Sequence, residues 1–192
     1  MSHRQESAAR IEVLTLVTTL DSATMAARAG ARFVDTAGDD ALAASIRRAG
    51  LDVLVCGHGE TADLSRDPAA ALRGRTGLIC AGFAAAEHAM HQGVPRDRIV
   101  VQVTPAELAS SGAAADWRTL VDVDPEPPGL AAAPAGPAAD TAVPAGAVAT
   151  VCAWLGASII STRHVPQVRR CLDMAETVIG TRPPAWAVRG LA

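Results

Sequence analysis

The chain contains no lysine, no asparagine and no tyrosine in its 192 residues. Its 17 lysine-plus-arginine positions are therefore all arginine. The absence of lysine excludes a Schiff-base lysine and a lysine that binds phosphate, and the absence of asparagine excludes an asparagine ligand. Any site in this protein must therefore do without the amine of lysine, the amide of asparagine and the phenol of tyrosine.

Charge and long apolar runs are also scarce. Charged residues make up 19% of the chain and the net charge is -3, so we expect neither nucleic acid nor a membrane surface as a partner. No apolar run reaches the roughly 20 residues of a membrane-spanning helix. The polar residues 1–10 lack the apolar core of a signal peptide. We predict a cytoplasmic protein with a disordered leader, 1–10, and a single domain, 11–192.

The four cysteines, Cys56, Cys80, Cys152 and Cys171, are widely spaced and lie in apolar segments. Metal and disulfide frameworks use closer spacing, so we expect buried free thiols. Cys56 and His58 offer two metal ligands without a matching second pair, and we therefore predict no metal site.

Short apolar, β-branched segments alternate with helical segments along the chain. We predict strands over 11–18, 32–36, 51–56, 76–81, 98–103, 118–123 and 158–162. Such alternation specifies a parallel sheet with right-handed crossovers. We expect an α/β fold of the TIM-type (β/α) barrel kind, shortened to about seven parallel strands, because a full barrel needs about 250 residues. A doubly wound open sheet is the alternative, although no Gly-x-Gly-x-x-Gly follows the first strand.

Helix boundaries follow from capping residues, prolines and glycines. We predict helices over 21–29, 39–49, 68–73, 84–92 and 165–179, one that begins at Pro105, and one in the second half of 141–155. The Pro- and Ala-rich segment 125–146 is expected to be a flexible loop. On a barrel it would lie on the ligand-binding face, where a lid is the functional alternative.

Polar residues occur at the carboxyl ends of predicted strands, which meet on one face of a barrel. Asp35, Gln102, Asp122 and Asp124 lie at such positions. Asp35 is the best single acid, and its alternative role is to cap the helix or turn that follows.

Arg163 and His164 form the polar tip between the last strand and the last helix. An arginine there could bind a phosphate bidentately, and a helix N-terminus also favours anions. His164 could share that anion or cap the helix that begins at Val165. A plain surface turn is the alternative interpretation.

The last predicted unit resembles the final strand and helix of the dihydropteroate synthases. That family reads roughly Gly-Ala-x-Ile-x-Arg-x-His-Asp-Val and then Leu-x-Met, and this chain reads GASIISTRHV over 156–165 and LDM over 172–174. Weaker matches follow in the same order over 17–22, 29–39, 49–54, 93–103 and 120–124. The resemblance covers most of the chain and implies the family's barrel with one unit, the third, missing.

The family joins dihydropterin pyrophosphate to p-aminobenzoate and releases pyrophosphate with the help of magnesium. Its ligands are aspartates, asparagines, a lysine and a last-strand arginine and histidine. This chain departs at nearly all of those positions. The family's asparagines on the first and fourth strands fall on Leu16 and Val55, and its sixth-strand aspartate falls on Gln102. Its seventh-strand Ser-Arg-Lys falls on 124–126. The last-strand arginine falls on Ser161 and the histidine on Arg163.

We therefore interpret the chain as a dihydropteroate synthase-like protein of folate biosynthesis that is catalytically degenerate, a pseudoenzyme that acts as a non-catalytic or regulatory partner. Asp35, Gln102, Arg163 and His164 are its candidate ligands for a pterin or another anion, and no residue is proposed as catalytic. One alternative is an active transferase with a remodelled site, which would use Mg²⁺. Another is a binding protein for a different phosphorylated metabolite. The resemblance also implies a homodimer or a complex with another protein.

Overall fold

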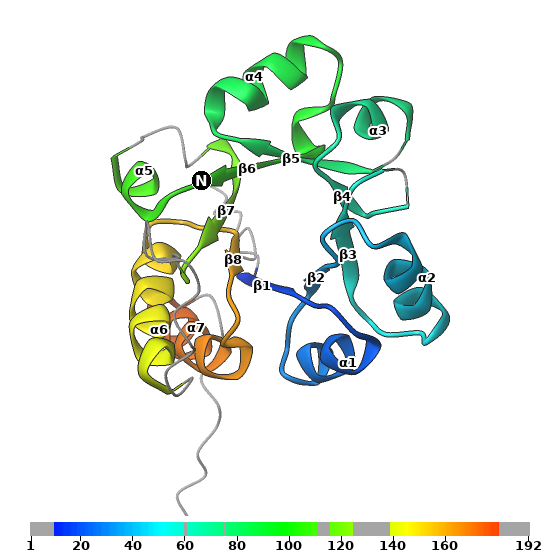
Figure 1. The fold of residues 1–192 in the computed structure, drawn as a ribbon. Helices are drawn as coiled ribbons and strands as arrows, with labels where there is room; N and C mark the ends of the chain where they lie inside the picture. The colour runs from blue at the N-terminus through cyan, green and yellow to red at the C-terminus, as the bar shows by residue number, and fades with distance from the viewer. Residues whose placement is uncertain (1–9, 60, 75, 111–115, 125–138, 181–192) are drawn as a thin grey trace, which may run out of the picture.

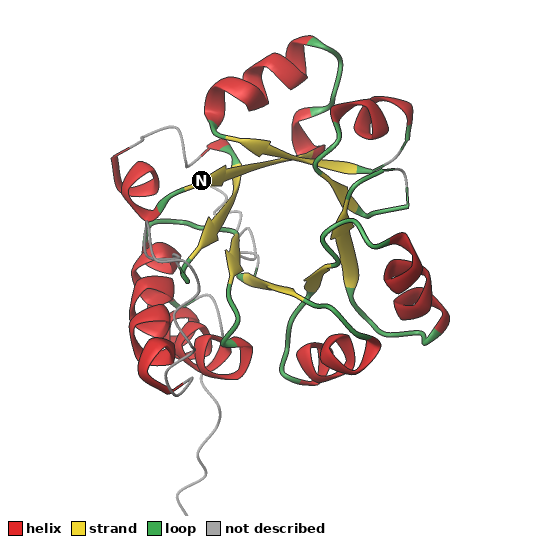
Figure 2. Ribbon diagram, viewed as in Figure 1, coloured by secondary structure: helices red, strands yellow, loops and turns green. Residues whose placement is uncertain are grey.

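The computed structural model of the chain describes residues 10–59, 61–74, 76–110, 116–124 and 139–180. Eight parallel strands form a closed barrel in chain order, and β1 pairs with both β2 and β8. The helices form an outer ring around the strands (Figures 1 and 2). The prediction of a TIM-type barrel is confirmed and the open-sheet alternative is wrong. Of the predicted leader, only Arg10 lies within the described residues.

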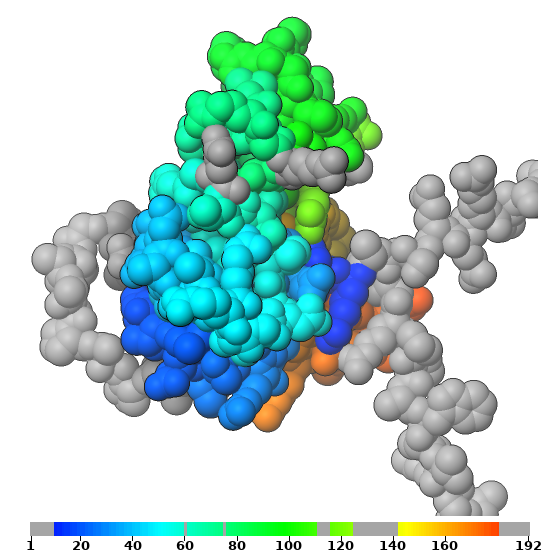
Figure 3. All heavy atoms as spheres, turned by 90° about the vertical axis from the view of Figure 1, so that its right-hand side faces the viewer, coloured from blue at the N-terminus to red at the C-terminus, as the bar shows by residue number. Residues whose placement is uncertain are grey.

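The strands are short, as expected of a small barrel. They are β1 Glu12–Leu16, β2 Phe33–Asp35, β3 Leu54–Gly57, β4 Leu64–Ser65, β5 Gly77–Ala81, β6 Ile99–Val103, β7 Arg118–Asp122 and β8 Ile159–Ser161. The helices are α1 Leu20–Arg28, α2 Asp40–Arg48, α3 Pro68–Arg73, α4 Phe83–His91, α5 Pro105–Ser110, α6 Ala139–Trp154 and α7 Val165–Ile179, with a 3₁₀ turn at Arg96–Arg98. Seen from the side, the first half of the chain, coloured from blue to green, forms the surface that faces the viewer (Figure 3). None of the described helices combines the length and apolarity needed to cross a membrane.

The barrel has eight strands, so the expected count of about seven is wrong. The missed strand is β4, which has only two residues. Long-range hydrogen bonds extend its pairing: Asp63 N donates to Val55 O and Gly77 N donates to Asp63 O, both at 2.8 Å. Gly77 allows this close pairing, because a Cβ there would lie 2.5 Å from Leu64 Cδ2.

The expectation that a whole strand–helix unit is missing is also wrong. All eight strands are present, and the chain is shortened by a helix instead. Residues 58–63 connect β3 to β4 directly, with Glu60 the one residue of this connection that the structure does not describe.

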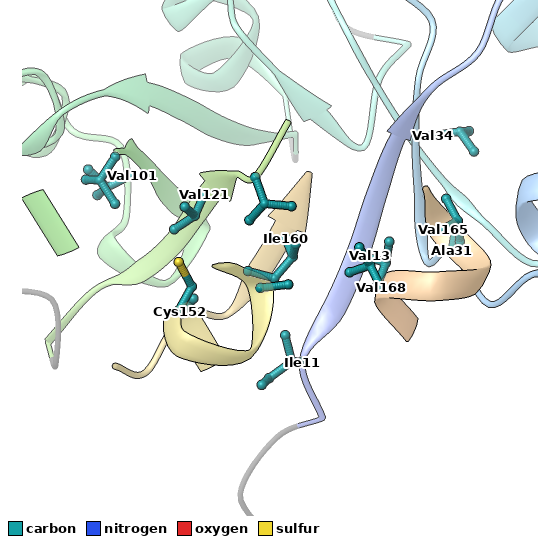
Figure 4. Packing of buried hydrophobic residues seen from close by; sticks show 14 of the residues in the cluster. Ile11, Val13, Ala31, Val34, Val101, Val121, Cys152, Ile160, Val165 and Val168 are labelled. Atoms are coloured by element: carbon teal, nitrogen blue, oxygen red, sulfur yellow. The ribbon is translucent and has the colours of Figure 1, made fainter. Parts of the chain in front are cut away.

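The interior of the barrel is filled by one ring of side chains, one from each strand. Its members are Leu14, Phe33, Cys56, Leu64, Ile79, Val100, Leu120 and Ile159. A second, larger core lies between the strands and the helices. Figure 4 shows part of it, with Cys152 of α6 beside Val121 and Ile160, and Val168 of α7 beside Val13. Three of the four predicted free thiols are buried, and Cys171 is partly buried.

The segment predicted as a loop over 125–146 is partly helical, because α6 begins at Ala139 and continues through Pro144. Residues 125–138 lie outside the described part of the chain. Gly146 lets α6 pack closely on α7, since a Cβ at this position would lie 2.8 Å from Cys171 Sγ.

Helix α7 holds the start of β1 and so closes the barrel. Glu176 Oε1 accepts a hydrogen bond from Ile11 N at 2.8 Å, and Arg169 Nη1 donates one to Ile11 O at 2.6 Å. Arg169 Nη2 lies 2.9 Å from Glu176 Oε2. These two buried side chains satisfy the backbone at the β1–β8 seam.

Candidate functional site

The carboxyl ends of the strands form the mouth of the barrel. Side chains alternate along a strand, so the residue two positions after each interior residue also points inward. This places Leu16, Asp35, Gln102, Asp122 and Ser161 around the mouth. The pairing register sets Leu16 beside Asp35, and Asp122 beside Ser161.

Asp35 is buried at the mouth and both of its carboxylate oxygens have partners. Oδ2 accepts a hydrogen bond from Arg66 Nη1 at 2.7 Å, and Oδ1 accepts one from Ala37 N at 2.8 Å. Helix α2 is capped by Asp39, so the alternative of Asp35 as a helix cap is wrong, whereas its role in the turn at Ala37 is real. Asp35 is therefore held by an ion pair and a turn.

We predict that Arg66→Ala lowers the free energy of unfolding by about 1–3 kcal/mol, because it leaves the Asp35 carboxylate buried without its counter-ion. Denaturation by urea measures this loss. Arg32→Ala is the matched control, since the partner of Arg32, Asp52, has a side chain that is 97% exposed. Exposed pairs contribute about 0–1 kcal/mol. Equal losses in the two variants would contradict a structural role for the Asp35–Arg66 pair.

The tip between β8 and α7 is occupied by a carboxylate from the same chain. Asp124 Oδ2 accepts a hydrogen bond from Thr162 Oγ1 at 3.0 Å and another from the backbone N of Arg163. The same oxygen lies 3.9 Å from Arg163 Nε. A hydroxyl, a backbone N–H and a guanidinium are the groups that bind a phosphate oxygen. Here all three surround Asp124.

Arg163 and His164 lie side by side at this tip, as consecutive residues at the start of α7. The Arg163 side chain is 65% exposed. His164 is the N-cap residue of α7, yet its side chain makes no capping hydrogen bond. Its backbone N donates to Thr162 Oγ1 at 3.0 Å. The capping role proposed for the His164 side chain is therefore wrong.

Asp122 lies next to this tip, where its Oδ1 accepts a hydrogen bond from Asp124 N at 3.0 Å. Burial raises the pKa of Asp122 above its ordinary value, and the nearby charge of Asp124 raises it further. The hydrogen bond from Asp124 N and the charge of Arg163 act in the opposite direction. Two neighbouring carboxylates thus make this side of the mouth unfavourable for a further anion.

Gln102 lies on β6, which pairs with β7, the strand that carries Asp122. It lines a cavity of about 300 Å³ together with Arg66, Cys80 and His88. The mouth therefore has two separate polar groups: the Asp35–Arg66 pair, and the cluster of Asp122, Asp124 and Arg163.

Two residues of the mouth were missed by the sequence-based prediction, namely Arg66 and Thr162. Arg66 follows β4, and a strand of two residues is too short to show the alternation of apolar and polar residues by which strands are predicted. The signal that points to it is the helix start at Asp67 and Pro68, because a (β/α) unit requires a strand just before its helix.

Magnesium, which the resemblance implies, does not fit the mouth. Mg²⁺ requires oxygen ligands, and the apolar Leu16, which the resemblance places at the family's first-strand asparagine, offers none. Within the described ranges, no group of three or more histidine, cysteine, aspartate or glutamate side chains could hold a metal ion. The Asp124 carboxylate is an oxygen ligand of the kind that Mg²⁺ prefers. Its Oδ2, however, already accepts hydrogen bonds from Thr162 and Arg163 at the β8–α7 tip.

Comparison with known proteins agrees with the geometry at the level of the fold. The Mycobacterium tuberculosis protein Rv1207 is similar over 92% of this chain and 94% of its own, with a TM-score of 0.67 and 21% identity. The Thermus thermophilus dihydropteroate synthase is similar over 89% of this chain and 94% of its own, with a TM-score of 0.71 and 16% identity. The Yersinia pestis dihydropteroate synthase is similar over 90% of this chain and 94% of its own, with a TM-score of 0.67 and 16% identity.

No protein-family model and no curated protein matches the chain. The structures nonetheless define the class: this chain has the dihydropteroate synthase-like (β/α) barrel fold. Solved structures of that class include an Anaplasma phagocytophilum synthase with bound 6-hydroxymethylpterin-monophosphate and a Xanthomonas albilineans synthase in complex with 7,8-dihydropteroate.

The structure also corrects the position assigned to the family's fourth-strand asparagine. Val55 packs in the outer core with the helices, so a ligand at this position would point away from the mouth. Cys56 is the inward-facing residue of β3. Burial raises the pKa of the Cys56 thiol far above its ordinary value, and the charge of Asp35 adds to the rise. A neutral thiol there does not replace an amide ligand.

Proposed function

We propose that this chain is a non-catalytic member of the dihydropteroate synthase-like barrels, a pseudoenzyme that acts through binding to protein rather than by transferring a pterin. The observation that carries the proposal is the Asp124 carboxylate at the β8–α7 tip. It takes the hydrogen bonds of Thr162 and Arg163 that an incoming pyrophosphate oxygen would need.

Two further observations support the proposal. The mouth cannot offer the family's asparagine and lysine ligands, because the chain contains neither residue type. Its best acid, Asp35, is neutralised by Arg66 at 2.7 Å and so is not free to bind the guanidine-like edge of a pterin. Losing a buried hydrogen bond to a ligand costs about 1–3 kcal/mol each, so several losses together remove most pterin affinity.

The competing proposals are an active transferase with a remodelled site and a binding protein for another phosphorylated metabolite. Both need an anion at the mouth. The guanidinium of Arg163 is exposed to solvent at the tip, where it could bind an anion. This observation supports the binding protein for a phosphorylated metabolite.

We predict that inorganic pyrophosphate binds Asp124→Ser at least about 10-fold more tightly than it binds the wild-type chain. Removing the carboxylate frees charge-assisted hydrogen bonds worth about 1.5–3 kcal/mol, which correspond to about 10–100-fold in Kd. Isothermal titration calorimetry measures the change. Asp97→Ser, at an exposed site in the turn before β6, is the control, and adding Arg163→Ala to Asp124→Ser should remove the gain.

The opposite pattern would favour the phosphorylated-metabolite proposal. In that case the wild-type chain would bind pyrophosphate tightly, lose the binding in Arg163→Ala, and gain nothing from Asp124→Ser.

A further inference from the structure

A hollow of about 1080 Å³ lies at the end of the barrel opposite to the mouth. Residues at the amino ends of strands line it, among them Glu12 of β1, Arg32 just before β2 and Arg118 of β7. The mouth is formed by the carboxyl ends of the same strands, so the two concave surfaces are separate. We call this second one the basal hollow. Its volume is that of a pocket for a small organic ligand, which measures about 300–1,000 Å³.

Much of the lining of the basal hollow is apolar and small. The alanines Ala31, Ala153 and Ala157 line it, and each of them is buried. Trp154, at the end of α6, lines it as well, and this side chain is 64% exposed. An exposed indole beside small apolar residues offers a flat surface on which an aromatic ring can stack. The apolar part of the lining therefore suits a flat ring system.

The rest of the lining is charged, with more cations than anions. Within the described part of the chain it contains four arginines and two carboxylates, namely Arg10, Arg32, Arg118, Arg169, Glu12 and Asp52. Guanidinium groups bind carboxylates and related anions through paired hydrogen bonds, and they also stack on flat rings. The composition of the lining thus favours a ligand that is both aromatic and anionic.

Two of these arginines are held by carboxylates of the fold. Arg169, whose side chain is 8% exposed, lies 2.7 Å from Asp173 and 2.9 Å from Glu176. Arg118 pairs with Glu12. Both arginines serve the structure at this end of the barrel, and a ligand would have to compete with partly or fully buried carboxylates for them.

Arg32 is held far more loosely. Its Nη1 lies 2.8 Å from Asp52 Oδ1, but the Asp52 side chain is 97% exposed and the Arg32 side chain is 42% exposed. An ion pair with a fully exposed carboxylate contributes little to stability. An anionic group in the hollow can therefore replace Asp52 as the partner of Arg32 at a small cost.

We propose that the basal hollow binds an aromatic organic acid. Its ring system packs against Trp154 and the buried alanines, and its anionic group pairs with Arg32. The chain already places an arginine over an aromatic ring at this end of the barrel, because Arg118 Cζ lies 5.5 Å from the centroid of the Phe33 ring. The site is new with respect to the proposed function, which concerns the mouth.

Fluorescence titration of the full chain with anilinonaphthalene sulfonate, an aromatic acid, tests the proposal. Phenylnaphthylamine, which has the same rings without the sulfonate, is the matched neutral probe. We expect the wild-type chain to bind the sulfonate. Arg32→Ala should weaken this binding at least about 10-fold in Kd, because a charge-assisted interaction is lost, and should leave phenylnaphthylamine within about two-fold. Trp154→Ala should weaken both probes, by about 3–10-fold.

Arg96→Ala is the control for binding to surface arginines. Arg96 Cζ lies 4.5 Å from the centroid of the Trp117 ring, so the chain has a second arginine beside a tryptophan outside the described lining of the hollow. This variant should bind the sulfonate like the wild type. Near-ultraviolet circular dichroism confirms that each variant keeps its tertiary packing, because loosely packed states bind the sulfonate by themselves.

Three results would overturn the proposal. The first is a wild-type chain that shows no saturable binding of the sulfonate. The second is an equal weakening of both probes in Arg32→Ala, since the anionic group would then not be recognised. The third is an equal loss in Arg96→Ala and Arg32→Ala. Asp124 and Arg163 take no part in this site, so the pyrophosphate titration tests the proposed function separately, and either proposal can fail without the other.

Discussion

Glu176→Ala lowers the free energy of unfolding by about 3–5 kcal/mol, the range expected when one partner of a buried ion pair is removed. Glu176 is only 2% exposed. Its loss leaves Ile11 N without an acceptor and removes one of the carboxylates that pair with the buried Arg169. Because Ile11 directly precedes β1, the damage falls on the seam that closes the barrel.

Urea denaturation of the wild type and the variant measures this loss. Arg170→Ala is the control on the same helix, since Arg170 is exposed and such surface changes stay within about 0.5 kcal/mol. Glu176→Gln should fall between the two, because glutamine can still accept from Ile11 N but carries no charge for Arg169. A loss below about 1 kcal/mol in Glu176→Ala would show that the seam is held by other contacts.

Those parts of the fold whose signals are local were predictable from the sequence. Helices α3 and α7 span 68–73 and 165–179, the predicted ranges. Each has a proline in its first turn, and α7 is capped at its C-terminus by Gly180, which adopts the left-handed conformation. The alternation of strands and helices was sufficient for the barrel class.

Strand β4 could not be predicted because its stability is not local. Two residues show no hydrophobic period. The strand forms because Asp63 bonds to Val55 and Gly77, which lie on β3 and at the start of β5. The number of strands, and the identity of Arg66 as a residue of the mouth, both depended on contacts between distant segments.

The candidate site was predictable in its residue types but not in its pairing. Asp35, Asp124 and Arg163 were identified as residues at strand ends. Nothing in the sequence indicates that Arg66 reaches Asp35 across 31 positions, or that Asp124 reaches Arg163 across 39. These pairings carry the proposed function, because they hold possible ligands in internal ion pairs.

The absence of turnover is the second large effect that we expect. Enzymes accelerate their reactions by about 10⁶-fold or more through positioned donors and charges. At this mouth Asp124 accepts the hydrogen bonds at the β8–α7 tip, and the acid Asp35 is paired with Arg66. The resemblance places Leu16 at the family's first-strand asparagine. If the proposed function is correct, the chain keeps the barrel scaffold without the groups that would stabilise a departing pyrophosphate.

The most direct measurement is the release of pyrophosphate by the purified chain, given dihydropterin pyrophosphate, p-aminobenzoate and magnesium, beside a dihydropteroate synthase of known activity. We predict that the release does not exceed that of the enzyme-free control. Release that depends on p-aminobenzoate and disappears in Asp35→Ala and in Arg163→Ala would contradict the proposal, and would mean that a different set of residues performs the family's reaction.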